Sequence, residues 1–257
     1  MLAAQRIIAG AEYVRQITAL ESDRRARAAF LNLVLKLARP DAALFDFGAG
    51  PGIDARFYAE HGFSVSAYDV DVKMCDFFAE HCRDFINVGS VKIESGSYAD
   101  FLARHRTSAA RGFDLITSNF APLNLITDLK ELFTTFHALT CPSGKVLASV
   151  LNPYFLGDLR YRWWWKNALR LWRSGHFSVP GAQAPIVRRR LGNFGVQSAP
   201  YFKLERVFPG LPSNHLQRES GIDVSSGPRQ AWMHLTKCRF MFLLFQRCAF
   251  PRHGTSQ

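Results

Sequence analysis

The sequence of 257 residues lacks the cysteine spacing that a metal site requires. Its five cysteines, at positions 75, 82, 141, 238 and 248, follow no metal-ligand pattern. An odd number of cysteines without a pattern is typical of reduced thiols in a cytoplasm. We therefore expect no metal and a cytoplasmic location.

Long apolar runs are also missing. The first residues, MLAAQRIIAGAEYVRQ, carry charges early and lack the apolar centre of a signal peptide. The longest late apolar run, residues 240–245, has the length of a strand and is too short to cross a bilayer. Because apolar residues make up 48% and charged residues 21%, the composition indicates an ordinary globular chain, which we interpret as one domain over residues 1–257.

Acidic residues are scarce in the second part of the chain. Residues 1–150 contain 16 Lys/Arg and 17 Asp/Glu, whereas residues 151–257 contain 16 and 4. All of the positive excess therefore lies after residue 150. Such a field favours acidic ligands, nucleic acid or an anionic membrane surface, and a merely solvated basic face carries about equal weight.

Strand and helix patterns alternate over the first 152 residues. An N-terminal helical cap (1–40) contains a helix at residues 12–38, which Ser22 or Asp23 can cap and Pro40 ends. The pattern then predicts strands at 43–48, 64–70, 91–96, 113–120 and 144–152, and helices at 53–61, 72–86, 98–105 and 125–139. This alternation predicts an α/β fold, a doubly wound parallel sheet with helices on both faces.

The alternation stops at Asn152, which Pro153 follows. We expect a core at residues 41–152, then an aromatic and basic insertion at 153–200 with a helix at 155–175 and a loop-like stretch at 176–200. In the closing part, residues 201–257, the stretches 201–208 and 239–248 have the pattern of strands, as an antiparallel pair at one edge.

A glycine-rich turn follows the first predicted strand. It reads Asp-x-Gly-x-Gly-x-Gly, from Asp46 to Gly52. The dinucleotide fingerprint fails because Ile53 stands where its third glycine belongs, and the Gly-Lys-Ser/Thr of a phosphate loop is absent. An acid here repels a pyrophosphate but suits an ammonium group. Asp69, at the tip of the second strand, suits two ribose hydroxyls. An ammonium and a ribose together describe S-adenosylmethionine.

The motifs resemble those of the class I S-adenosylmethionine-dependent methyltransferases. LFDFGAGPGIDARFYAEHG (44–62) looks like the family's first motif and VSAYDVDVKM (65–74) like its second, which implies that Asp69 binds the ribose and Met74 packs on the adenine. GSYADF (96–101) resembles the third motif, with Ser97 where the family has Asp. The adenine contact is therefore open between Ser97 and Asp100. The resemblance implies a Rossmann-like, mostly parallel seven-stranded sheet with an antiparallel edge strand and a helical substrate lid.

The fourth and fifth strands extend the resemblance. FDLITSNFAPLN (113–124) is similar to a bacterial subgroup with Ser-Asn-Phe before Leu-Asn, which places Asn119 and Phe120 near the transferred methyl. LTCPSGKVLASVLNPY (139–154) resembles the family's Pro-Gly-Gly turn, with Ser143 replacing one glycine. The cofactor-binding residues thus implied are Asp46, Phe47, Gly48, Ala49, Gly50, Gly52, Asp69, Val70, Met74, Ser97, Tyr98, Asn119 and Phe120.

The acceptor is not identified by any motif. NPYF (152–155) is similar to a motif of enzymes that methylate nucleic-acid bases, but that motif ends the fourth strand and NPYF follows the fifth. Methyl transfer from a sulfonium is a direct displacement that requires alignment above all, and no catalytic residue is assigned. The substrate-side candidates are Tyr13, Asn124, Tyr154, Trp163, Trp164 and His176. His176 fits an ordinary surface or capping histidine better.

Three interpretations of the tryptophan cluster at 163–172 stay open: core packing of a lid helix, a pocket for an aromatic or lipid-like acceptor, and docking at a membrane interface. Arg188, Arg189 and Arg190 fit a solvated face, with an anionic acceptor as the alternative. The leading hypothesis is methylation of a small molecule, with S-adenosylhomocysteine as product and without nucleic acid. The alternatives are an RNA methyltransferase and an inactive nucleoside-binding module. The oligomeric state is open.

Overall fold

The structure is a computed structural model and describes residues 14–15, 19–106, 112–181, 184–210, 222–223 and 236–248. Tyr13 lies outside the described residues. The main sheet has the strand order β3-β2-β1-β4-β5-β10-β8-β9. Its strands are β1 (Ala43–Phe47), β2 (Ser64–Asp69), β3 (Val91–Ser95), β4 (Phe113–Ser118), β5 (Thr140–Leu151), β8 (Phe202–Pro209), β9 (Ile222–Asp223) and β10 (Phe240–Arg247).

The first five strands of the sheet pair in parallel, and β10 runs antiparallel between β5 and β8. The two-residue strand β9 pairs antiparallel with β8 at the edge. The predicted mostly parallel sheet, with antiparallel pairing at one edge, is thus confirmed. β10 can occupy this position because its first six residues, FMFLLF, are buried on both faces of the sheet.

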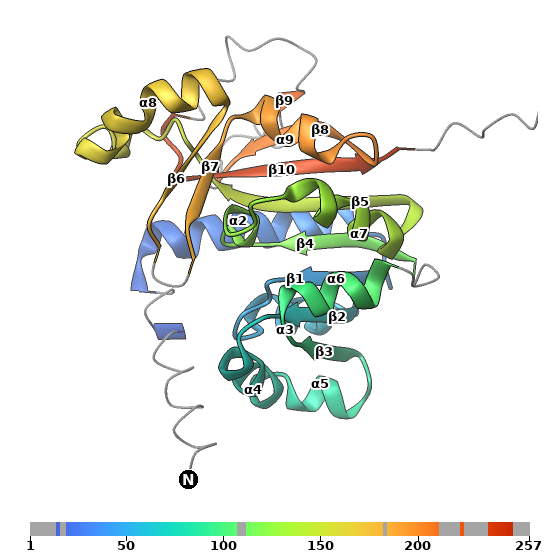
Figure 1. Cartoon of the computed structure of the whole chain (residues 1–257). Helices are drawn as coiled ribbons and strands as arrows, with labels where there is room; N and C mark the ends of the chain where they lie inside the picture. Colours follow the sequence, from blue (N-terminus) through green and yellow to red (C-terminus); the bar gives the residue numbers. More distant parts are fainter. Residues whose placement is uncertain are drawn as a thin grey trace, which may run out of the picture.

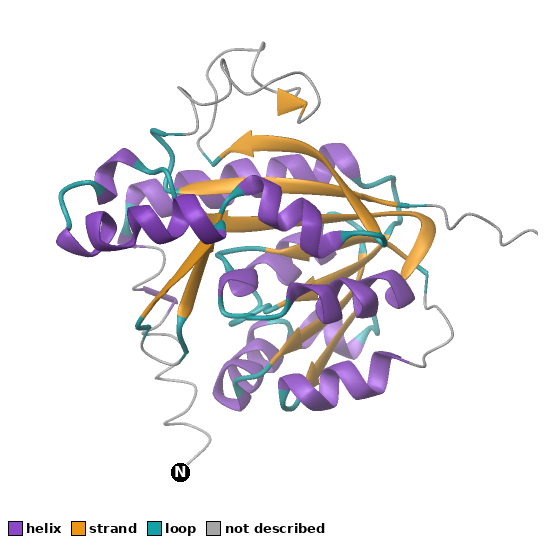
Figure 2. Ribbon diagram, turned by 45° about the horizontal axis from the view of Figure 1, so that its top comes forward, coloured by secondary structure: helices purple, strands orange, loops and turns teal. Residues whose placement is uncertain are grey.

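Helices cover both faces of the sheet (Figures 1 and 2). One face packs against α2 (Glu21–Leu37), α3 (Ile53–Glu60) and α4 (Val72–His81) through Phe30, Tyr58 and Phe78. The other face packs against α6 (Tyr98–Arg106), α7 (Leu129–Leu139) and α9 (Leu191–Ser198) through residues such as Phe101 and Phe133. This double cover explains why the central strands are apolar throughout rather than alternating.

Several predicted helix boundaries differ from the structure. The predicted helix at 72–86 divides at Cys82 into α4 and α5 (Arg83–Asn87). Neither Ser22 nor Asp23 caps α2, which begins at Glu21 after the extended Leu20. Instead, the carboxylate of Asp23 accepts from Ser22 and approaches Arg239. The predicted helix at 125–139 begins only at Leu129, after the short 3-10 helix η1 (Pro122–Asn124).

The loop-like interpretation of residues 176–200 was wrong. This stretch forms a separate hairpin of β6 (His176–Val179) and β7 (Ile186–Arg189), followed by α9. Arginines occupy the buried end of β7, so the apolar pattern that reveals a strand is missing. Two glycines disfavour α9 locally, but its Phe194 is fully buried, and tertiary packing outweighs the propensity.

The insertion after β5 is helical, as predicted. The chain passes through η2 (Leu156–Asp158) into α8 (Arg162–Ser174), which lies at one end of the molecule beside the β6–β7 hairpin (Figure 1). Over the described residues, none of the helices combines the length and the apolar character needed to span a membrane.

Candidate active site

The sheet reverses its strand order at β1, which has β2 on one side and β4 on the other. In open α/β sheets, ligands bind beyond the carboxyl ends of the strands at such a reversal. The glycine-rich turn follows β1 at this point, and the loop that contains Asn119 and Phe120 follows β4. The structure therefore brings the predicted motifs to one edge of the sheet.

The three glycines of the turn serve different purposes. All have positive φ, at +73° for Gly48, +54° for Gly50 and +80° for Gly52. A Cβ at Gly48 would lie 2.5 Å from Cγ of Pro122, and one at Gly52 would lie 2.7 Å from Cδ2 of Phe78. A Cβ at Gly50 would meet no atom of the described residues within 4 Å. Gly48 and Gly52 thus permit internal packing, whereas Gly50 leaves bare backbone open to a ligand.

Asp69 connects the tip of β2 to the glycine turn. Its Oδ2 accepts a 2.7 Å hydrogen bond from the amide of Gly50, and its Oδ1 accepts one of 2.8 Å from the amide of Asp71. Burial raises the pKa of Asp69, and these two amides oppose that rise. Each carboxylate oxygen keeps a second acceptor position, which can receive a ligand hydroxyl. Val70 beside it is exposed and Met74 is half-buried.

Asp46 is a buried acid with one oxygen unsatisfied. Only 2% of its surface is exposed, and its Oδ1 accepts a 3.0 Å hydrogen bond from the hydroxyl of Thr117. Its Oδ2 is buried and has no hydrogen-bond partner among the described residues. Burial, reinforced by the neighbouring Asp54 carboxylate, raises the pKa of Asp46 to about 8. A cationic group would restore the charge and supply the missing partner.

Asn119 belongs to a buried network that sequence reasoning missed. Its Nδ2 donates to Oδ2 of Asp54 at 2.8 Å, and its Oδ1 accepts from the amide of Phe120. Asp54 also forms an ion pair with Arg27 of α2, whose guanidinium lies 4.4 Å from the centroid of the Phe120 ring. In the sequence, Asp54 is indistinguishable from an ordinary acid in the first turn of a helix.

The loop after β4 is strained. Phe120 and Ala121 have φ of +59° and +70°, although neither is glycine. Left-handed non-glycine residues cost of order 1–3 kcal/mol each and are concentrated at functional sites. The network of Arg27, Asp54 and Asn119 holds this conformation in place.

Three other predicted cofactor residues, Phe47, Ser97 and Tyr98, make contacts within the protein, Tyr98 by packing against the hydrophobic core. Phe47 is buried and stacks on Tyr68, so only its backbone is available to a ligand. The hydroxyl of Ser97 donates to Oδ2 of Asp100 at 2.7 Å and accepts from the amide of Asp100, which closes the start of α6. This hydrogen bond lowers the pKa of Asp100. Burial raises the pKa of Tyr98, the third of these residues.

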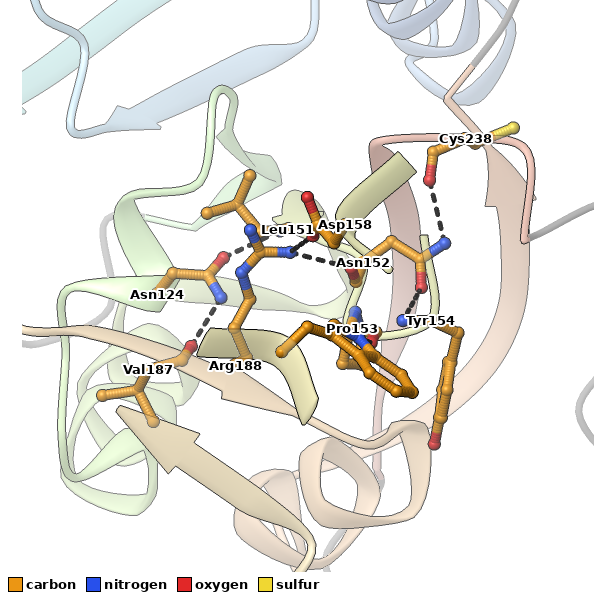
Figure 3. A network of polar contacts seen from close by, with 10 residues as sticks. Asn124, Leu151, Asn152, Pro153, Tyr154, Asp158, Val187, Arg188 and Cys238 are labelled. Carbon is orange, nitrogen blue, oxygen red and sulfur yellow. Dashed lines mark hydrogen bonds and ion pairs between the residues drawn. The ribbon is translucent and has the colours of Figure 1, made fainter. Parts of the chain in front are cut away.

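Asn124, a predicted substrate-side residue, has both ends of its side-chain amide bonded within the protein. It is fully buried, and its Nδ2 donates to the carbonyl of Val187 at 2.6 Å (Figure 3). Its Oδ1 accepts from the amide of Leu151 at 2.9 Å. Because both ends of the amide are bonded to the main chain, Asn124 fastens β7 to the end of β5.

The interpretation of the arginine run as a solvated face was wrong for Arg188 and Arg189. Arg188 is buried, forms an ion pair with Asp158 at 3.2 Å and donates to the carbonyl of Asn152 at 2.8 Å (Figure 3). Arg189 is fully buried and donates to three carbonyls in the loop after β4, those of residues 123, 126 and 127. Burial lowers the pKa of Arg189 to about 10. These contacts lock the hairpin over the carboxyl edge of the sheet.

The remaining substrate-side candidates differ in exposure. Tyr154 is half-buried, and burial raises its pKa to about 12. Trp163 packs against Phe177, and Trp164 donates its indole N–H to the carbonyl of Pro153 at 3.1 Å. His176 is exposed and contacts the carbonyl of Ser174, as an ordinary surface histidine does. Within the described ranges, no three His, Cys, Asp or Glu side chains form a group that could hold a metal ion.

Comparison with known proteins gives a family and many similar folds. A family model described as a methyltransferase domain matches residues 19–186. A TehB-like SAM-dependent methyltransferase from Corynebacterium glutamicum is 14% identical, with a TM-score of 0.56 over 94% of this chain and 99% of that one. No curated protein matches the sequence.

Two further solved structures differ in their ligands and partners. The 1,6-didemethyltoxoflavin-N1-methyltransferase of Burkholderia thailandensis, solved with 1,6-didemethyltoxoflavin and S-adenosylhomocysteine, is 16% identical, with a TM-score of 0.60 over 96% of this chain and 88% of that one. A structure from a Haloferax volcanii complex of a methyltransferase with its activator Trm112 is 10% identical, with a TM-score of 0.60 over 94% and 97%.

Proposed function

The chain belongs to the methyltransferase-domain family, and we propose that it transfers a methyl group to a small-molecule acceptor at the carboxyl ends of β1 and β4. The observation that carries this proposal is the open backbone at Gly50 between two buried acids, Asp46 and Asp69. This arrangement has room for a ligand, a partner for a cation and acceptors for hydroxyls.

The residues present fit S-adenosylmethionine, the methyl donor. When bound, it supplies a methyl group that its positively charged sulfonium has already activated for displacement. Asp46 would face the ammonium, since its Oδ2 is buried without a partner among the described residues. Asp69 would accept the ribose hydroxyls, and Met74 at the start of α4 would lie against the adenine. Gly50 would let the ligand approach the backbone.

The chain's own residues contribute mainly alignment. The Thr117 hydroxyl donates to Oδ1 of Asp46 and so orients the unsatisfied Oδ2. The Arg27–Asp54–Asn119 network holds the strained loop at Phe120 beside the end of β4. A direct in-line displacement needs this positioning more than it needs a general base. We assign no residue as a general base.

The lid supports a small acceptor over RNA. Asn124, Arg188 and Arg189 fasten the β6–β7 hairpin over the carboxyl edge, which suits an enclosed acceptor site. Two arginines of the basic second part are buried and cannot contact RNA. An aromatic acceptor fits the half-buried Tyr154 and Trp163 beside this edge. An RNA acceptor would predict binding that weakens steeply with added salt.

Calorimetric titration with S-adenosylmethionine and with S-adenosylhomocysteine, without acceptor, tests the cofactor site. We expect micromolar binding, about −8 kcal/mol. Asp69→Ala should weaken binding by roughly 1–3 kcal/mol, because ribose hydroxyls lose their acceptor. Asp71→Asn, which retains an N-cap for α4, is the control and should bind as the wild type does. Equal affinity of Asp69→Ala and wild type would remove Asp69 from the site, and no binding of either ligand would contradict the proposal.

A further inference from the structure

Helix α8 is anchored to the protein along one face. Leu171 is buried, and the indole of Trp164 donates to the carbonyl of Pro153. Trp163 lies over Phe177 of β6, with ring centroids 6.1 Å apart, and beside the guanidinium of Arg188. The orientation of the helix on the hairpin is therefore determined by packing, and its opposite face is presented outward.

The outward face carries an apolar stripe. Trp165, Leu169 and Trp172 are 63%, 53% and 72% exposed. Their spacing of four and then three residues places them on one side of a helix. The indole N–H of Trp165 donates to the carbonyl of Leu159 at 2.7 Å, so the ring is held in place with its polar atom satisfied. Two exposed tryptophans and a leucine on one helix face indicate an interaction surface.

A basic stripe runs beside the apolar one. Arg162, Lys166 and Arg170 follow at intervals of four residues, and Arg173 lies on the same side. All four are exposed. The helix contains no acidic residue, and the sequence has none between Asp158 and Glu205. A surface that complements this face must therefore be negatively charged and accept apolar rings.

We propose that α8 docks in the plane of a membrane surface rich in anionic phospholipids. The rings of Trp165 and Trp172, with Leu169, would enter the boundary between head groups and acyl chains, where tryptophan is favoured. The four basic side chains would lie at the lipid phosphates. At 1.5 Å per residue, the 13-residue helix is about 20 Å long, which suits lying on a bilayer rather than crossing it.

RNA and a protein partner both fit this surface less well than a membrane does. RNA would contact the basic stripe but would leave Leu169 and Trp172 without an apolar environment. A protein partner would need an acidic groove opposite the helix. A bilayer with anionic head groups satisfies both stripes at once. The inference does not rest on the proposed function, since α8 lies at one end of the molecule (Figure 1) and its outward side chains are not among the residues proposed to bind the cofactor.

Binding of the full chain to vesicles tests the proposal. Flotation would use vesicles of phosphatidylglycerol and phosphatidylcholine in equal parts, and vesicles of phosphatidylcholine alone. We expect binding to the mixed vesicles, weakened by salt, and at least about tenfold weaker binding to the neutral ones. Tryptophan fluorescence should be quenched by brominated phosphatidylglycerol, because the indoles would reach the acyl boundary.

Two pairs of variants distinguish binding through α8 from nonspecific adsorption of the protein to vesicles. Trp165→Ala with Trp172→Ala should lower binding to mixed vesicles at least about tenfold, whereas Val88→Ala with Val196→Ala, at exposed apolar positions elsewhere, should not. Lys166→Glu with Arg170→Glu should have a similar effect, whereas Lys92→Glu with Lys130→Glu changes the net charge equally and should matter much less. Thermal melting and cofactor titration show that each variant is folded.

Three results would overturn the proposal. The first is absence of wild-type binding to the mixed vesicles. The second is binding that the paired tryptophan variant leaves unchanged. The third is a dimer or an RNA complex that disappears in the tryptophan variant while vesicles bind neither protein. Loss of vesicle binding with normal cofactor titration would concern α8 alone, so the outcome is distinguishable from a failure of the proposed function.

Discussion

The sheet core around the glycine turn and the β6–β7 hairpin bury charged groups in opposite ways. In the core, Asp46 is buried with an oxygen that no described residue satisfies, and its pKa is raised to about 8. In the hairpin, Arg189 is buried just as deeply but donates to three carbonyls. A buried ionisable group that lacks a partner is typical of a ligand site, whereas one with several partners is typical of a structural contact. We therefore expect ligand recognition at Asp46, whereas the Arg189 contacts fasten the hairpin to the loop after β4.

Gly50→Val should have the largest effect, a loss of ligand binding at the glycine turn. We expect the affinity for S-adenosylmethionine to fall at least about a thousandfold, about 4 kcal/mol, because the side chain would occupy the space that the ligand needs. Gly62→Val is the matched control. Gly62 also has positive φ and open space around its Cβ, but it lies in the turn between α3 and β2. Calorimetry measures both, and an unchanged titration of Gly50→Val would refute the loop assignment.

Arg189→Leu should destabilise the protein by loosening the β6–β7 hairpin. We expect the free energy of unfolding to fall by about 2–4 kcal/mol, since three carbonyls would lose their donor. Arg190→Leu, at the half-buried neighbouring position, is the control and should cost less than about 1 kcal/mol. Urea denaturation gives both values. Equal losses would mean that the position in the hairpin, rather than the three hydrogen bonds, determines stability.

Asp46→Asn should stabilise the ligand-free protein while weakening the site. The raised pKa means that Asp46 supports folding below about pH 4 and that this support is lost as the pH rises towards 8. The variant should therefore match the wild type near pH 4 and exceed it by about 1–2 kcal/mol at pH 8. Its affinity for S-adenosylmethionine should be lower, increasingly so at higher pH. A variant less stable than the wild type at pH 8 would contradict the unsatisfied-charge interpretation.

Ala121→Gly should give the smallest effect. Ala121, in the loop after β4, has a left-handed conformation that glycine adopts without strain. We expect a gain of up to about 1 kcal/mol in unfolding free energy, measured by thermal melting. Ala42→Gly, at a buried position without positive φ, should lose about 1 kcal/mol instead. If both variants lost the same unfolding free energy, the inference of backbone strain at Ala121 would be wrong.

Local patterns sufficed to predict the core. Alternating strands and helices, the glycine turn and an acid at the tip of β2 are all short-range features, and Asp46, Gly50 and Asp69 lie where they were expected. Prediction failed where distant partners decide. The ion pair between Asp54 and Arg27 joins residues 27 positions apart, and it cannot be predicted from the sequence because it forms only when α2 lies beside α3. Asn124 was predicted to contact the substrate, and its bond to the carbonyl of Val187 in β7, over sixty residues later, could not be predicted from local sequence.

The order of the strands and helices and the place of the glycine turn follow from local sequence, because hydrophobic period and turn chemistry act over a few residues. The sequence also determines that the positive charge lies after residue 150. Which of those charges are buried depends on contacts between distant parts of the folded chain. Arg188 and Arg189 are buried because backbone carbonyls and Asp158 accept their hydrogen bonds. Lys166 and Arg170 are exposed, beside two exposed tryptophans. Burying a charge is costly, so its location depends on partners that only the folded chain brings together.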